Sequence, residues 1–348
     1  MPKKFLSLSL TLAFALALLV AGCGGSKPAE QAKSAAPAAK KVIKISIGLN
    51  EQTPEYKGLL KFKEVIDAKL PGKYDIQPYA NAQLGDDVKA TEAVRNGTLE
   101  MTGPSTSPLT GLAPELAVFD LPFLFPNTDI AYKVLDGPVG EKIAKTLESK
   151  GLKCLAYWEN GFRQLTNSVR EVKTPDDVKG LKIRVMQNPI HIAIWKALGA
   201  NPTPMPYSEV FTAMQQKTID GQENPIPTIY QSKFYEVQKY CTLTGHVYTP
   251  FVLLINKKLF DSMPPEDQKV FLEAAKAGEA EVRKLSKEMN DSQVGKLKEA
   301  GMVVTTLTPE QHKAFEDAVK PVYDEFSNKI GKQLVDEVRA EVARLSKQ

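Results

Sequence analysis

Arg184 lies in a short segment whose pattern suits a β-strand with one buried face. The segment 180–185 reads GLKIRV, so its apolar side chains point to one side and Lys182 and Arg184 to the other. A guanidinium inside a globular domain needs an anion, because it keeps its proton and its planar N–H groups match a carboxylate. That anion is either an acidic residue in a structural salt bridge or a bound acid, and the pattern leaves both open.

Residues suited to catalysis are scarce in this chain. The polar segment 220–225 reads DGQENP and has no catalytic triad near it. The sequence contains no GxSxG elbow, no P-loop, no CxxC pair and no HExxH helix. Its histidines, His191, His246 and His312, are too dispersed to suggest a metal site. We therefore expect a protein that holds a small acid without transforming it, and we expect no metal and no cofactor.

The N-terminus has the pattern of a bacterial export signal. Lys3 and Lys4 precede an apolar core at 5–20, which is short for a membrane-spanning helix. The following LVAGC resembles a lipobox, whose cysteine, here Cys23, becomes the lipidated first residue of the mature chain. We expect residues 1–22 to be a signal peptide and acyl chains on Cys23 to tether the protein to a membrane. An uncleaved anchor helix and an ordinary signal with an incidental cysteine are the alternatives.

Residues 23–41 contain little that can form a core. They are mostly Gly, Ser, Pro, Ala, Gln and Lys, a composition that predicts a flexible linker. The formal net charge of +4 is concentrated in these residues and the signal, which leaves about −1 from Val42 onward. A nearly neutral domain lacks the basic surface that nucleic acid binding requires, so we expect no nucleic acid partner.

Strand and helix patterns alternate through the first part of the folded chain. Residues 42–49 and 74–79 fit strands, whereas 59–70 and 87–95 fit helices. This alternation predicts an α/β fold, and a chain of this length is expected to form more than one domain. The Pro-rich segment 121–126 breaks regular structure and should be a packed loop.

The last third of the chain is strongly helical. Pro264 and Pro265 precede acidic residues and so mark a helix start. A helix that continues to Glu299 would be about 50 Å long, which exceeds one domain and predicts that it crosses two. Earlier in the chain, Ser208 is placed to cap a helix at 209–216.

Cys154 and Cys241 each lie in an apolar, strand-like run. We expect two buried free thiols. A disulfide between them remains open, because an exported protein meets an oxidising compartment.

Long segments of the chain resemble one family of receptors. Residues 158–240 include WENGFRQLTNS, TPDDVKGLKIRVMQNP, KALGANPTPMPYSEVFTAMQQKTIDGQENP and IYQSKFYEVQKY. Together with AQLGDD at 82–87, AVFDLPFLF at 117–125 and GHVYTPF at 245–251, they resemble solute receptors of TRAP (tripartite ATP-independent periplasmic) transporters. The similarity is to the DctP branch, named after four-carbon dicarboxylate uptake, and it covers approximately residues 43–321.

The resemblance implies a particular architecture. It is a periplasmic-binding-protein-like fold in which two α/β lobes, joined by β-strands and one long spanning helix, close over the ligand. It assigns residues 42–160 and 250–289 to lobe 1, and residues 161–249 and 290–348 to lobe 2. His246, in the matching GHVYTPF segment, is then expected to form hydrogen bonds in the hinge region.

The resemblance also implies which residues of lobe 2 hold the ligand. Arg184 matches the arginine of the GLKxRV motif, which would anchor a carboxylate through two hydrogen bonds. Arg163 matches a second arginine on the cleft wall, and the alternative for it is an ion pair within the protein. Asn224 matches the asparagine of QENP, whose amide would hydrogen-bond the acid. Its neighbour Glu223 is expected to be structural, because a free carboxylate would repel an anionic ligand.

Further cleft residues are implied by the same resemblance. Those expected from lobe 1 are Asn50, Asp87, Ser105 and Thr106, although Asp87, beside Asp86, is equally suited to a helix N-cap. Trp158 and Tyr207 would add aromatic surface to the cleft, or would belong to the core.

We therefore expect a lipid-anchored receptor in the periplasm or on the outer face of the cell membrane. It would capture a four-carbon dicarboxylate or a related carboxylate and deliver it to the membrane permease subunits of a TRAP transporter. A ligand-sensing subunit of a membrane histidine kinase and a surface-anchored hydrolase are the alternatives.

Overall fold

The computed structural model describes residues 39–347. The predicted signal peptide and Cys23 lie outside the described residues, and the first strand already begins at Lys41. Within the described part of the chain, every helix is too short or too polar to cross a membrane.

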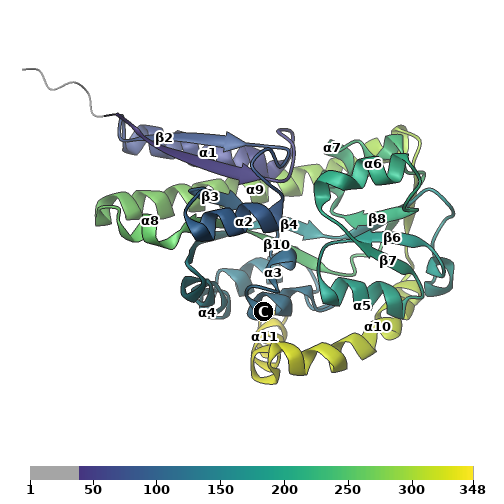
Figure 1. Ribbon diagram of the computed structural model, residues 1–348. Helices are drawn as coiled ribbons and strands as arrows, with labels where there is room; N and C mark the ends of the chain where they lie inside the picture. Colours follow the sequence, from purple (N-terminus) through teal and green to yellow (C-terminus); the bar gives the residue numbers. More distant parts are fainter. Residues whose placement is uncertain (1–38, 348) are drawn as a thin grey trace, which may run out of the picture. The chain divides into compact units, whose positions relative to one another are not determined.

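Two mixed β-sheets form the framework, and helices cover them (Figure 1). The first sheet has the order β2-β1-β3-β10-β4, with β1 Lys41–Ile47, β2 Tyr74–Tyr79, β3 Met101–Gly103, β4 Leu152–Phe162 and β10 Tyr248–Asn256. The second has the order β11-β9-β5-β8-β6-β7, with β5 Gln164–Asn167, β6 Lys182–Val185, β7 Asn201–Pro204, β8 Gly221–Asn224, β9 Tyr240–Leu243 and β11 Val303–Thr306. We call these sheets, with their covering helices, lobe 1 and lobe 2.

The helices that accompany the first sheet come mainly from the first half of the chain. They are α1 Pro54–Lys69, α2 Asp87–Asn96, α3 Thr128–Leu135, α4 Pro138–Thr146 and α8 Lys257–Asp261, with 3-10 turns at Ser107–Leu109, Pro114–Asp120 and Leu147–Lys150. Those of the second are α5 Pro189–Ala197, α6 Val210–Gln215 and α7 Ile226–Gln231, with 3-10 turns at Pro175–Val178, Tyr207–Glu209 and Phe234–Glu236. The predicted α/β architecture with two lobes is confirmed.

The lobes are joined by two neighbouring strand crossings and by the long helix α9, Pro265–Glu299. Arg163 alone separates β4 from β5, and residues 244–247 separate β9 from β10. Strands β4 and β10 pair antiparallel in lobe 1, and β5 and β9 do so in lobe 2. Helix α9 packs on α1 in lobe 1 and on α7 in lobe 2, as its length predicted (Figure 1).

Close packing between α1 and α9 fixes the position of β4 beneath them. A Cβ atom at Gly278 would lie 2.9 Å from the carbonyl oxygen of Gly58 and 2.6 Å from the Trp158 ring. The Trp158 indole donates to the carbonyl of Ala275 at 3.0 Å. Trp158 is therefore a core residue of lobe 1 and not part of the cleft, because the two helices cover it.

The C-terminal helices depart from the predicted division. Helix α10, Pro309–Ile330, packs on α5 of lobe 2, but α11, Lys332–Leu345, packs on α3 and α4 of lobe 1. The buried side chains of α11 are Val335, Val338 and Leu345, which join the core of α3 and α4. Assigning all of residues 290–348 to lobe 2 was therefore wrong for α11.

Several local predictions can be compared directly with the structure. The segment 121–126 forms no helix or strand and buries Leu121, Leu124 and Phe125, as expected of a packed loop. The cap predicted at Ser208 was wrong, because this residue lies inside a 3-10 turn and α6 begins at Val210.

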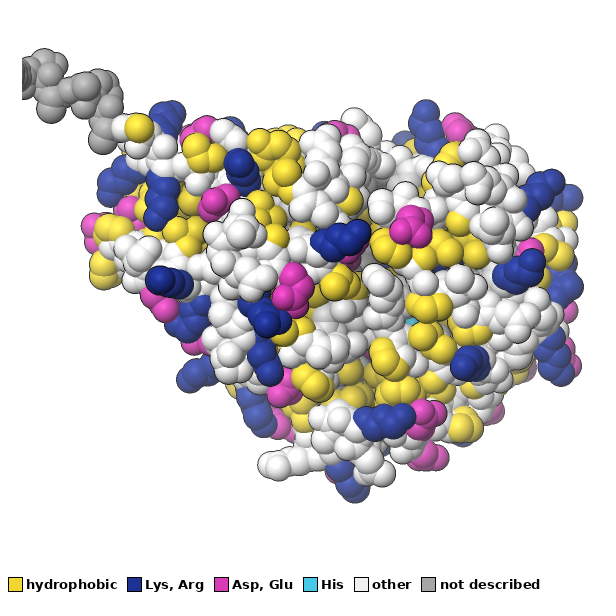
Figure 2. All heavy atoms as spheres, in the orientation of Figure 1, with side chains coloured by type: hydrophobic (Ala, Val, Ile, Leu, Met, Phe, Trp, Pro, Cys, Tyr) yellow, Lys and Arg dark blue, Asp and Glu magenta, His cyan; other side chains and the backbone are white. Residues whose placement is uncertain are grey.

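Cys154 and Cys241 are free thiols, as expected, and lie on β4 and β9 respectively. Cys241 is buried, as expected, whereas Cys154 is only partly buried. Acidic and basic side chains are interspersed on the face shown in Figure 2, in keeping with the small net charge.

Candidate functional site

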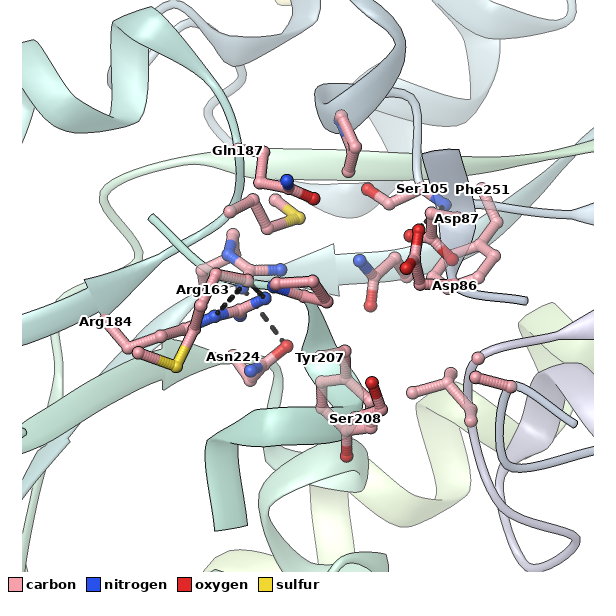
Figure 3. A pocket seen from close by; sticks show the side chains of 18 residues that line it. Asp86, Asp87, Ser105, Arg163, Arg184, Gln187, Tyr207, Ser208, Asn224 and Phe251 are labelled. Atoms are coloured by element: carbon pink, nitrogen blue, oxygen red, sulfur yellow. Dashed lines mark hydrogen bonds between the residues drawn. The ribbon is translucent and has the colours of Figure 1, made fainter. Parts of the chain in front are cut away.

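A pocket lies between the two sheets and draws its walls from both lobes (Figure 3). It contains about 550 Å³ of space, part of which is open to solvent. The side chains of lobe 2 in its wall include Arg163, Arg184, Gln187, Tyr207 and Asn224; those of lobe 1 include Asp86, Asp87, Ser105, Asn160 and Phe251.

Arg184 is a buried cation without an acidic partner among the described residues. It extends from β6, is 2% exposed and lines the pocket. Its Nε and Nη2 atoms donate to the carbonyl of Met205 at 3.0 and 2.7 Å, and among residues 39–347 it forms no salt bridge. Burial, and next the charge of Arg163, lower the pKa of Arg184 to about 10. The structural salt bridge considered for Arg184 is therefore absent from the described residues, and an anion in the pocket would compensate this charge.

Arg163, in contrast, is paired within the protein. It is fully buried at the crossing between β4 and β5, and its Nε and Nη2 atoms donate to the carboxylate of Glu223 on β8. Nη2 also donates to the Oδ1 atom of Asn224 at 3.1 Å. Arg163 therefore lines the pocket, but most of its N–H groups donate to residues of β8. The ion pair within the protein that was the alternative for Arg163 is present, with Glu223 as its partner.

Glu223 is the centre of a buried polar network that extends away from the pocket. Burial alone would raise the pKa of Glu223, but Arg163 and the two histidines hold this pKa well below its usual value. His246 Nε2 lies 3.2 Å from a Glu223 oxygen, and His191 Nδ1 lies 3.7 Å from the other. Glu223 is thus structural, as expected. His246 lies in the crossing between β9 and β10 and hydrogen-bonds Thr244 and Glu223, as expected of a hinge-region residue.

The network continues from lobe 2 into lobe 1. His191 Nε2 lies 3.1 Å from Asp120, and Asn188 donates to the second oxygen of Asp120 at 2.8 Å. Asn188 also donates to the carbonyl of Ser107 at 2.9 Å. Buried hydrogen bonds therefore hold the start of α5 against lobe 1 beside the pocket.

Asn224 stands beside the two arginines with its amide partly engaged. Its Oδ1 accepts from Arg163, and its Nδ2 donates to Gln222 at 2.5 Å. An amide group has two donor hydrogens and two acceptor lone pairs, so one of each remains for a ligand.

The opposite wall of the pocket is acidic. Asp86 is the N-cap of α2, since its carboxylate accepts from the backbone N–H groups of Val88 and Lys89. Asp87 is therefore not the cap, and it is directed into the pocket, where its Oδ2 accepts from the backbone N–H of Ser105 at 3.3 Å. Burial raises the pKa of Asp87 to about 7. Figure 3 shows Asp86, Asp87 and Ser105 across the pocket from Arg163, Arg184 and Asn224.

Apolar surface closes the pocket between these polar ends. Tyr207 presents its ring to the pocket while its hydroxyl hydrogen-bonds Ser232, and burial raises its pKa to about 12. Met186, Met205 and Phe251 also line the wall. Aliphatic parts of a ligand would pack here.

Two of the remaining expected residues lie outside the pocket wall. Asn50 instead reaches across to lobe 2, where its Nδ2 donates to the carbonyl of Gln231 at 3.1 Å. Thr106 is fully buried, and its hydroxyl donates to the carbonyl of Pro250 at 3.3 Å. These two side chains, like that of Trp158, are engaged by the protein itself.

Other wall residues were not singled out from the sequence. Asn160 and Gln187 are polar, as are Asp86 and Ser208, which the sequence suggested only as helix caps; Asn160 donates to the hydroxyl of Thr249 at 3.0 Å. Asn160 lies two residues after Trp158, where the pairing of β4 with β10 shifts its register, so strand periodicity alone does not assign its face. Gln187 follows β6 in a loop, for which the sequence gives no comparable signal.

Comparison with known proteins agrees with this geometry. Residues 45–329 match the family described as bacterial extracellular solute-binding protein, family 7 (DctP). The chain is 43% identical to the sugar acid binding protein DctPAm of Advenella mimigardefordensis strain DPN7T, solved in complex with galactonate; the TM-score is 0.86, and the match covers 88% of this chain and 98% of that one.

Two curated relatives extend the comparison. The 2,3-diketo-L-gulonate-binding periplasmic protein YiaO of Escherichia coli (strain K12) is 42% identical over 74% of this chain and 78% of its own length. The C4-dicarboxylate-binding periplasmic protein DctP of Rhodobacter capsulatus is 35% identical over 87% of this chain and 91% of its own. The chain belongs to the DctP family of extracytoplasmic solute-binding proteins, the solute receptors of TRAP transporters.

Proposed function

We propose that this protein captures a small organic acid between its lobes, with Arg184 as the carboxylate anchor, and delivers it to the membrane permease subunits of a TRAP transporter. The observation that carries the proposal is the buried Arg184 guanidinium, which faces the pocket and has no acidic partner among the described residues. The relatives named above bind sugar acids or four-carbon dicarboxylates, so they support a carboxylate ligand. They give no support to the sensory alternative.

Binding is coupled to the arrangement of the lobes. The pocket wall is complete only when both lobes contribute to it, and Asn50 and Asn188 form hydrogen bonds from one lobe to the other. A ligand that touches both walls has a higher affinity for the closed arrangement and shifts the population toward it. The permease would then recognise the closed receptor.

The ligand leaves the receptor chemically unchanged. The pocket offers cationic, amide and hydroxyl groups that fix an acid in place, and the relatives named above are binding proteins. Incubation of each bound acid with the purified protein, followed by mass spectrometry, should return the acid unmodified. A time-dependent product would support the hydrolase alternative.

The central test is calorimetric titration of the purified protein with a panel of sugar acids and dicarboxylates. At least one acid should bind to the wild-type protein and lose most of its affinity for Arg184→Met. Equal affinity for both proteins would contradict the proposed role of Arg184.

The anchor proposed at Cys23 needs a separate test, since this residue lies outside the described residues. If Cys23 is lipidated, mass spectrometry of the mature N-terminus should find acyl chains on this residue, and Cys23→Ser should lose them. A wild-type N-terminus without acyl chains would contradict lipidation at this position.

A further inference from the structure

The pocket is electrically asymmetric, and this asymmetry bears on the chemical class of the ligand. One end presents the unpaired guanidinium of Arg184, whereas the other presents the carboxyl groups of Asp86 and Asp87 (Figure 3). We propose that Asp87 and Ser105 form a hydroxyl-binding end that excludes a second carboxylate, so that the ligand is a hydroxylated monocarboxylic acid rather than a dicarboxylate. This inference rests on the proposed function.

Asp87 has free acceptor capacity that faces the pocket. Its Oδ2 accepts one hydrogen bond, from the backbone N–H of Ser105, and no donor to its Oδ1 is found among residues 39–347. Asp86, in comparison, is compensated by two backbone N–H groups of α2 and by Lys89 at 3.3 Å. Asp87 is thus the carboxyl group that would meet the far end of a ligand held by Arg184.

Ser105 supplies a second unsatisfied group at the same end. Ser105 is 2% exposed, and its hydroxyl has no hydrogen-bond partner within the described chain. A buried hydroxyl without a partner is costly, so a polar atom of a ligand would satisfy it. A ligand hydroxyl can donate to Asp87 and accept from Ser105, because it offers both functions in one atom.

A second ligand carboxylate fits this end poorly. It has no proton to donate at pH 8, where Asp87 is mostly ionised, and the two like charges would repel strongly in this partly desolvated site. The repulsion between this carboxylate and Asp87 would have to be relieved by protonating Asp87 or by displacing the ligand from Arg184. Either route lowers the affinity for a dicarboxylate relative to a hydroxy acid of similar size.

An ammonium group is the remaining chemistry that an acidic wall could attract. We favour hydroxyls, because the residue that contacts Asp87 is Ser105, whose buried hydroxyl pairs with uncharged partners. An amino acid probe therefore belongs in the test.

The test uses probes matched in length: D-erythronate, succinate and 4-aminobutanoate, each with four carbons, together with D-galactonate. Calorimetric titration at pH 8 compares the wild-type protein with Asp87→Asn, Ser105→Ala and the control Glu92→Gln. The control removes a carboxylate from the same helix, α2, at a residue that lies outside the pocket wall and pairs with Arg95. Thermal unfolding of each variant verifies that it is folded.

The wild-type protein should bind the better of the two hydroxylated acids at least ~10-fold more tightly than succinate, consistent with a hydrogen bond to a charged group. Asp87→Asn should reduce this preference at least ~10-fold, by weakening hydroxy acid binding and admitting succinate. Ser105→Ala should weaken hydroxy acid binding without admitting succinate, and Glu92→Gln should leave the preference nearly unchanged.

Three results would overturn the inference. They are succinate binding as tightly as the hydroxylated acids, a preference for 4-aminobutanoate, or an unchanged preference in Asp87→Asn. Each still shows that an acid binds, so the proposed function would survive them. Absence of binding by every acid would instead contradict the proposed function, and this inference with it.

Discussion

Replacement of Arg184 by methionine should nearly abolish ligand binding and yet leave the unliganded protein about as stable as before. The lowering of the pKa of Arg184 from 12.5 to about 10 corresponds to about 3 kcal/mol of unfavourable burial for its charge. Removing the guanidinium relieves this cost, but it also leaves the carbonyl of Met205 without its two donors, which costs about 1–3 kcal/mol. These contributions nearly cancel in the free energy of unfolding.

Ligand binding has no such compensation. Loss of one partner of a buried, hydrogen-bonded charge pair costs about 2–5 kcal/mol, or roughly 30-fold to several thousand-fold in Kd. A ligand at about 100 times its Kd stabilises the wild-type protein by about 2.7 kcal/mol, and at the same concentration it should stabilise the variant by less than about 1 kcal/mol.

Two measurements on the same samples test this prediction. Calorimetric titration gives Kd, and urea unfolding with and without ligand gives the free energy of unfolding. Arg184→Lys is the control, because it keeps the charge but loses the planar pair of donors, and it should retain part of the affinity. A large loss of stability in unliganded Arg184→Met, with ligand stabilisation preserved, would refute the reasoning and make Arg184 a structural residue.

The remaining predictions concern stability. Arg163→Met should lower the free energy of unfolding by about 3–5 kcal/mol, because it leaves Glu223 buried without its main partner. Denaturant titration measures this change. A change as small as that expected for Arg184→Met would contradict the ion pair. Gly278→Ala should lower the melting temperature, since its Cβ would lie 2.6 Å from the Trp158 ring, and an unchanged value would mean that α9 can shift. Burial raises the pKa of Glu55 from 4.5 to about 8, so the stability it contributes is present below pH 4.5 and is lost as pH rises toward 8, by on the order of 4 kcal/mol. Thermal unfolding between pH 5 and 9 should therefore show a decline that is weaker in Glu55→Gln.

The sequence alone was sufficient to predict features that depend on neighbouring residues in the chain, such as strand periodicity and helix start signals. Arg184 was found because strand periodicity separates it from its apolar neighbours and because a guanidinium must meet an anion. Helix α9 was found from its proline start, its acidic first turn and its apolar spacing. These requirements are local, so the residues that express them are close together in the chain.

Contacts between distant segments could not be predicted in this way. Trp158 and Asn160 lie two residues apart on β4, but only the packing of α1 and α9 decides that the first is covered, while the second reaches the pocket. Whether Arg163 would meet Glu223 or a ligand depended on the pairing of β5 with β8, and the spacing of the two residues does not reveal it. Asn50 was expected in the cleft, but its side chain bonds Gln231 outside the pocket wall, and this contact joins residues far apart in the chain.

The path of the C-terminal helices restricts how the receptor can open. Helix α10 is attached to α5 and α11 to α3 and α4, and Gly331, with a φ of 110°, is the single residue between them. Any rotation of one half relative to the other must either be absorbed by the backbone torsions of Gly331 or detach one helix from its support. Helix α10 also contacts the 3-10 turn Pro114–Asp120 of lobe 1, so the end of the chain connects the two lobes, and lobe separation must change these contacts as well as the torsions of Gly331.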